Sequence, residues 1–299
     1  MNGRSGRAAY DAFRLFQVEL PRMLRSKRFA GAIALGIALV ATSAMLGHMS
    51  YEEWAGFARV GDAKTYEMVN RVACMYWTGV DGRPPSGLLC LLFPLLCLLP
   101  GAGTLIEDRA SGFLAQALAR TGDAPFYIAK ACACFVSAFL VVFIPLLAGI
   151  VFACMAAPWG NPDPSGYWSL MIPIDFSTPL RDQFFTNPLV YMLAWSSFAA
   201  LLCGAWSVAI LGISLFATSP ARLFVVSFLW QLVVNYLSAA LRKFTGGSLV
   251  CSFDLFTQIM PRGYEAAIPI VETMVLCGAV YLAVAVVVPM IFFRRRCYL

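Results

Sequence analysis

Six long apolar runs dominate this sequence and limit what it can fold into. They cover residues 29–47, 87–106, 131–157, 188–216, 223–241 and 267–293. A helix needs about 20 mainly apolar residues to cross the hydrocarbon core of a bilayer, and these runs match that length. The chain is 60% hydrophobic and only 13% charged, whereas about a quarter of a soluble domain is charged. We therefore predict a single all-α integral membrane domain, residues 1–299, with six transmembrane helices.

Basic residues at the two ends of the chain predict its orientation. Seven of them precede the first run: Arg4, Arg7, Arg14, Arg22, Arg25, Lys27 and Arg28. Only Asp11 and Glu19 oppose them, and Arg294–Arg296 follows the last run. Basic residues beside spans favour the cytoplasmic side of a membrane. We therefore expect both termini in the cytoplasm, which requires an even number of spans.

The basic N-terminal segment, residues 1–28, has an apolar face. The residues that share it at helical spacing are Phe13, Phe16, Leu20 and Leu24. This pattern favours an amphipathic helix on the inner membrane surface, kinked or divided at Pro21, over a solvated basic tail. The run 29–47 exceeds the apolar core of a signal peptide, which has about 7–15 residues, so we expect it to remain as the first span.

The most polar short connection between two runs is residues 103–130. It opens with the charged Glu107, Asp108 and Arg109, and Ser111-Gly112 then breaks the helical pattern. The next segment, Phe113–Arg120, is amphipathic, with apolar residues at helical spacing. Gly122 ends it, and Lys130 is expected at the water-facing edge of the third run. We predict a short surface helix between spans two and three.

Further structural expectations concern the second run, the segment 249–260 and two cysteines in the outer loops. The second run contains Pro94 and Pro100, so we expect a kinked helix that is buried in the bundle. The segment 249–260 is too apolar for a free loop and too short to span, which indicates a re-entrant or interfacial piece. Cys74 and Cys251 fall in two outer loops, where a disulfide and two free thiols are both open.

The sequence lacks the usual chemistry of an enzyme. It has no Gly-Lys dipeptide, and so no phosphate-binding loop for ATP, and we expect no cofactor and no metal site. The single histidine, His48, is expected at a helix end. Glu272 is expected at the outer membrane interface. Gln231 and Asn235 are four residues apart on one helical face, which suits an interhelical hydrogen bond or, alternatively, the lining of a substrate path.

The chain resembles the membrane (permease) subunit of bacterial ABC-2 type exporters. The residues that carry the resemblance are Glu107, Ser111, Gly112, Phe113, Leu114, Leu118, Arg120 and Lys130, together with the basic segment 22–29. The family has six spans, a basic amphipathic helix before the first, and a coupling helix between spans two and three. The long outer segment 158–187 departs from the simplest members.

The resemblance implies a permease subunit in the bacterial cytoplasmic membrane. Two permease copies, identical or different, would form a translocation path through the lipid, and separate ABC ATPase subunits would supply ATP hydrolysis. The residues implied in coupling are Glu107, Asp108, Arg109, Ser111, Gly112, Phe113, Leu114, Leu118 and Arg120. Arg14, Arg22 or Arg25 would add contacts to the ATPase, and no nucleic acid partner is expected.

A second interpretation assigns no transport to the chain. In a multi-pass scaffold or assembly subunit, the connection 103–130 would be a plain solvated turn. A lipid-modifying membrane enzyme is disfavoured because the sequence lacks a histidine–carboxylate constellation. Apolar spans with few buried charges suit a lipid-like, peptide or amphiphilic cargo.

Overall fold

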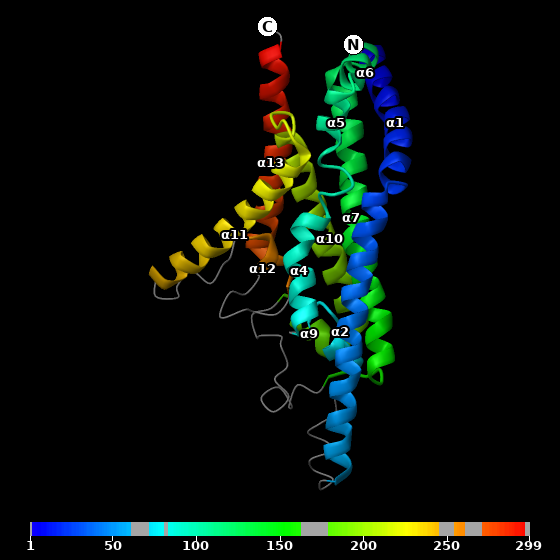
Figure 1. The fold of residues 1–299 in the computed structure, drawn as a ribbon, viewed down its shortest axis with the longest axis vertical. Helices are drawn as coiled ribbons and strands as arrows, with labels where there is room; N and C mark the ends of the chain where they lie inside the picture. The colour runs from blue at the N-terminus through cyan, green and yellow to red at the C-terminus, as the bar shows by residue number, and fades with distance from the viewer. Residues whose placement is uncertain are drawn as a thin grey trace.

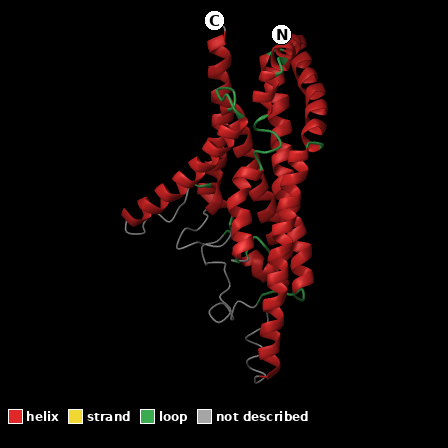
Figure 2. Cartoon of the chain, viewed as in Figure 1, coloured by secondary structure: helices red, strands yellow, loops and turns green. Residues whose placement is uncertain are grey.

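The computed structural model describes residues 2–60, 72–80, 83–162, 179–244, 254–260 and 271–296, and every regular element in them is a helix (Figures 1 and 2). The helices are α1 Asn2–Leu24, α2 Lys27–Val60, η1 Ala73–Tyr76, α4 Pro84–Leu96, α5 Thr104–Ala110, α6 Phe113–Thr121, α7 Asp123–Ala156, α9 Arg181–Thr186, α10 Pro188–Ile213, α11 Pro220–Phe244, α12 Leu255–Ile259 and α13 Val271–Arg296. The predicted all-helical class is confirmed for this part of the chain.

Five helices are long and apolar enough to cross a membrane. They are residues Lys27–Glu53 of α2, Asp123–Ala156 of α7, Pro188–Ile213 of α10, Pro220–Leu241 of α11 and Val271–Phe293 of α13. These five correspond to the first, third, fourth, fifth and sixth predicted runs. The architecture is that of a multi-pass membrane protein.

The second predicted run differs from the single kinked helix expected for residues 87–106. It forms two helices, α4 and α5, which are joined by turns over residues 97–103. Leu98 and Ala102 in this connection are fully buried, so the expectation of burial is confirmed. Pro100 lies in this connection and has no amide hydrogen to donate back to Leu96, whereas Pro94 lies inside α4.

Side chains of α10 satisfy the backbone of the broken segment. The Trp206 indole N–H donates to the carbonyl oxygen of Pro94 over 3.1 Å, and the Ser207 hydroxyl donates to that of Cys97, also over 3.1 Å. Irregular backbone is tolerated at membrane depth only where protein buries it and completes its hydrogen bonds. The α10 sequence therefore supports the interruption between α4 and α5.

The centre of the bundle is α10, which packs against both α7 and α13 (Figure 1). The outer helices α2, α11 and α13 turn many large apolar side chains outward; on α11 these include Val226, Leu229 and Val233. Outward-facing apolar side chains suit contact with lipid. The helices α5 and α6, the N-terminus and the C-terminal end of α13 lie at one end of the bundle, which we call the α6 end (Figure 1).

The helix α1 runs along the first part of α7 rather than across the ends of the spans (Figure 1). Its apolar face packs on α6 and α7, with Met23 buried and Phe16 and Leu20 partly buried. The helix passes through Pro21 and ends at Leu24, so the break comes after Leu24 and not at the proline. Much of its apolar face therefore covers protein, but Phe13, which was predicted on that face, is 58% exposed.

The short helix α12 lies inside the range 249–260 expected to be re-entrant or interfacial. Its residues are buried where it packs on α4, α10 and α11. The Trp195 indole N–H donates to the Ile259 carbonyl oxygen over 2.7 Å. His48 was expected at a helix end but lies inside α2, where its Nδ1 is 3.0 Å from the Ala156 carbonyl oxygen. Cys74 is a buried free cysteine.

Three expectations fall on residues that are only partly described. Cys251, the other candidate for the disulfide, lies outside the described residues, as does most of the long segment 158–187. The backbone of Arg294–Arg296 continues α13 at the α6 end.

Candidate functional site

The predicted surface helix is present as α6, Phe113–Thr121. A glycine with positive φ flanks it on each side: Gly112 has φ +75° and Gly122 has φ +80°. L-residues with a side chain seldom adopt this conformation, so glycine permits both changes of chain direction. The sequence pattern located these two boundaries correctly.

The two faces of α6 have different surroundings. Leu114 and Ala117 are buried against α1 and α7, and Leu118 is partly buried beside them. Phe113 is 41% exposed. The other exposed residues of the helix are Ala115, Gln116, Ala119 and Arg120. The helix therefore anchors one face on the bundle and leaves the other free at the α6 end.

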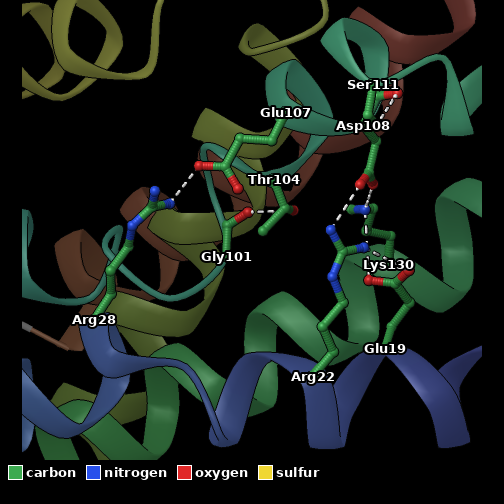
Figure 3. A network of polar contacts seen from close by, with 9 residues as sticks. All are labelled: Glu19, Arg22, Arg28, Gly101, Thr104, Glu107, Asp108, Ser111 and Lys130. Atoms are coloured by element: carbon green, nitrogen blue, oxygen red, sulfur yellow. Dashed lines mark hydrogen bonds and ion pairs between the residues drawn. The ribbon is translucent and has the colours of Figure 1, made fainter.

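The three charged residues before α6 contact different elements, and Figure 3 shows Glu107 and Asp108 pointing apart. Glu107 forms an ion pair with Arg28 of α2 over 2.6 Å. Asp108 accepts from Arg22 of α1 over 2.9 Å and also pairs with Lys130 of α7.

Arg109 contacts the turn after α10 and the helix α13. It donates to the carbonyl oxygens of Leu215 and Ala217, which follow the end of α10, and the Ala217 contact is 3.4 Å. Its guanidinium lies 5.8 Å from the centre of the Phe292 ring on α13. A cation at this position suits the negative end of the α10 dipole. Together the three residues connect α5 to α1, α2, α7, α13 and the turn that follows α10.

Asp108 belongs to an ionic cluster, which we define as Glu19, Arg22, Asp108 and Lys130; all but Arg22 are buried (Figure 3). The Asp108 side chain is 1% exposed and that of Lys130 is 0% exposed. The Lys130 ammonium also lies 3.4 Å from a carboxylate oxygen of Glu19. Buried charges are costly unless they are paired, and this cluster contains two cations and two anions.

The structure corrects the prediction for Lys130. It was expected at the water-facing edge of the third run, but its side chain is fully buried between α1, α5 and α7. The reason is the position of α1 along α7, which covers this part of the helix. Asp108, expected to contact a partner, is likewise buried within the chain.

Sequence reasoning missed Glu19 as a member of the cluster. Its signal was present, because Glu19 shares the face of α1 that carries Phe16, Leu20 and Met23. An acidic residue on the apolar face of an amphipathic helix needs a buried cation. Lys130 is that cation, contributed by a helix more than 100 residues later.

Arg22 was expected to contact an ATPase and instead pairs within the chain. Partial burial opposes the charge of its guanidinium, but the hydrogen bond and charge of Asp108, with the charges of Glu19 and Glu107, raise its pKa above the ordinary value. Arg14 and Arg25 are exposed.

Ser111 follows α5 directly. Its hydroxyl donates to the Asp108 carbonyl oxygen over 3.2 Å and so caps the C-terminal end of α5.

Gln231 and Asn235 lie far from α6 and make contacts between helices. The Gln231 amide oxygen accepts from the Leu255 backbone N–H over 3.0 Å, and its amide nitrogen donates to the Tyr281 hydroxyl over 3.4 Å. Asn235 donates to the Thr257 hydroxyl over 3.4 Å. The interhelical hydrogen bonds expected from the sequence are present, and they hold α12.

Among the described residues, no group of histidine, cysteine, aspartate or glutamate side chains is arranged to hold a metal ion. No model of a known protein family matches the sequence, and no curated protein matches it.

Proposed function

We propose that this chain is the permease subunit of an ATP-driven exporter of the ABC-2 type, and that α6 is its coupling helix. The observation that carries the proposal is the setting of α6. Its outer face is free at the end of the bundle, while the residues directly before it contact four other helices and the turn that follows α10. A partner that moved α6 would therefore displace much of the bundle.

The connections suit transmission of a rigid-body motion. Packed helices joined by ion pairs shift between discrete arrangements rather than deform gradually. The ionic cluster joins α1, α5 and α7, and Arg109 extends the connection to the turn that follows α10 and to α13. Closure of an ATPase dimer against α6 would thus change the relative positions of spans on both sides of α10.

In this proposal the α6 end faces the cytoplasm of a bacterial cell, and two permease copies enclose the path for the cargo. ATP hydrolysis belongs to separate subunits. A plain scaffold needs no ATPase at α6, so the two interpretations differ in whether an ATPase binds there.

The direct test is disulfide or maleimide crosslinking from α6. Cysteines at the exposed positions Ala115 and Ala119, in a background without native cysteines, should crosslink to a co-purified ATPase. Ala117→Cys is the matched control, because its side chain faces the bundle and should not react. Labelling of Ala115→Cys from outside intact cells would contradict the proposal.

A mild-detergent purification from the native host precedes the crosslinking. A stoichiometric subunit with a Gly-Lys-Ser/Thr phosphate-binding loop is the expected result. An intact preparation without any ATPase would support the scaffold interpretation instead.

A further inference from the structure

A second polar feature lies beside the ionic cluster, where α1 meets α2. It is a cavity of about 310 Å³, and its lining includes Arg22, Ser26, Lys27, Arg28, Pro100 and Glu107. We call it the junction cavity. Three cationic side chains and one carboxylate line it, so its lining has a surplus of positive charge.

The lining cations differ in how they are neutralised. Arg28 pairs with Glu107 over 2.6 Å, and Arg22 pairs with Asp108 over 2.9 Å. Within the described part of the chain, Lys27 forms no ion pair with a carboxylate, and its side chain is exposed. The cavity therefore has one uncompensated ammonium, flanked by two guanidinium groups that have further donors.

Ser26 adds a neutral donor to the same wall. Its hydroxyl oxygen accepts from the Phe29 backbone N–H over 3.1 Å. A serine hydroxyl that accepts one hydrogen bond still carries a proton to donate. An anion with several oxygen atoms could therefore accept from Lys27, from Ser26 and from the flanking arginines together.

The position of the cavity selects the kind of anion. Lys27 is the first residue of the first apolar helix long enough to cross a membrane. Basic residues at such a boundary lie at the level of the lipid headgroups, where anionic lipids attract them. The phosphate of a lipid is therefore the nearest anion of suitable size and charge.

We propose that the junction cavity binds the phosphate group of an anionic phospholipid, with Lys27 as its principal ligand. The lipid belongs to the leaflet at the α6 end. Its acyl chains would lie along the apolar outer surface of α2, where Ala30 and Leu35 are exposed. The proposal requires only that the chain is embedded in a membrane, so it does not depend on the transport function.

The test is native mass spectrometry of the full-length protein titrated with phosphatidylglycerol or with phosphatidylcholine of the same acyl chains. Wild-type protein should retain one phosphatidylglycerol at least about tenfold more tightly than phosphatidylcholine. Lys27→Gln should remove about tenfold of that affinity, because charge-assisted hydrogen bonds are the strong ones. Lys27→Arg, which keeps the charge, should retain most of it.

The matched control is Arg25→Gln. It also removes one positive charge, two residues before Lys27, but the Arg25 side chain is exposed and does not line the cavity. It should change the affinity by less than about threefold, because exposed charges at a distance are screened. Equal losses in Lys27→Gln and Arg25→Gln would show diffuse attraction to a basic surface and would overturn the proposal.

A third arm separates the lipid from a free anion. Inorganic phosphate at about 10 mM should leave phosphatidylglycerol bound, since the acyl chains add apolar contacts that phosphate lacks. Displacement of the lipid by phosphate would show that the cavity takes a soluble anion, and it would overturn the assignment to lipid. Equal retention of phosphatidylcholine, whose phosphate is neutralised by its choline, would show no preference for an anionic headgroup and would also overturn the proposal.

Discussion

At the residue scale, the environment of Lys130 explains much of the α6 end. The residue lies in the first third of α7, and its ammonium contacts carboxylates from α5 and from α1. Because Asp108 is also buried, neither charge has water as an alternative partner. The pair therefore fixes where α5 sits on α7, and Arg22 extends the same constraint to α1.

The first prediction compares two neighbouring carboxylates. Asp108→Asn should lower the free energy of unfolding by about 3 kcal/mol, because it removes the nearest anion from a fully buried lysine. Glu107→Gln should cost less than about 1 kcal/mol, because its pair with Arg28 is solvent-exposed. Thermal unfolding in detergent, monitored by tryptophan fluorescence, measures both.

A double variant controls for the loss of the side chain itself. Asp108→Asn combined with Lys130→Met should recover part of the lost stability, since it removes the unpaired buried lysine but leaves Glu19 with Arg22 alone as a cationic partner. An Asp108→Asn protein as stable as Glu107→Gln would show that the cluster contributes little.

Whether the sequence predicted the role of a residue depends on how far its contact partner lies along the chain. The charged triplet and the two glycines around α6 were recognised because their signals are local. Burial of Lys130 could not be predicted, since it depends on α1 packing along α7, a contact between residues far apart in sequence. The position of Glu19 on the apolar face of α1 was visible in the sequence, but its role depends on Lys130, which lies far away along the chain.

At the element scale, the boundaries of α6 depend on backbone conformation. A Cβ added to Gly112 would meet no atom within 4 Å, so substitution there acts through the positive φ alone. Gly31 in α2 also has open space around it but an ordinary helical conformation. These two glycines form a matched pair that isolates the backbone effect.

The second prediction uses that pair. Gly112→Ala should lower the free energy of unfolding by about 1 kcal/mol, because a left-handed conformation is strained in residues with a Cβ. Gly31→Ala should raise it by about 0.5–1 kcal/mol, since alanine favours a helix. In the transporter that we propose, Gly112→Ala should also reduce the transport obtained per ATP hydrolysed. Identical shifts in stability for both variants would contradict this account.

A different element-scale contact holds α12 against α11. The third prediction is that Gln231→Leu frees this helix, because the Leu255 backbone N–H loses its acceptor. In a cysteine-free background, a cysteine at Ile259, which is 2% exposed, should react several times faster with a polar maleimide when Gln231 is also changed. Asn235→Ala, which loses a longer 3.4 Å contact, should change the rate less. An unchanged rate in Gln231→Leu would show that Trp195 alone is sufficient.

At the scale of the whole molecule, the topology depends on the second apolar run, which forms the two helices α4 and α5. The N-terminus, α6 and the end of α13 all lie at one end of the bundle (Figure 1). Termini on the same side of a membrane require an even number of crossings, but only five described helices are long enough to cross alone. The segment from α4 to α5 is therefore expected to supply the sixth crossing. The six runs were readable from hydropathy, but hydropathy did not reveal that one of them is interrupted.

The fourth prediction tests that crossing with two reporters separated by this segment alone. Pro84, at the start of α4, and Ala115, on α6, are both exposed. In a cysteine-free background, Pro84→Cys should react with a membrane-impermeant maleimide added to intact cells, and Ala115→Cys should react only after lysis. The break between α4 and α5 is compatible with a crossing because Trp206 and Ser207 supply donors to its carbonyl oxygens within the bundle. Labelling of both cysteines from the same side would mean that the segment enters and leaves by one face, and it would place the two termini on opposite sides.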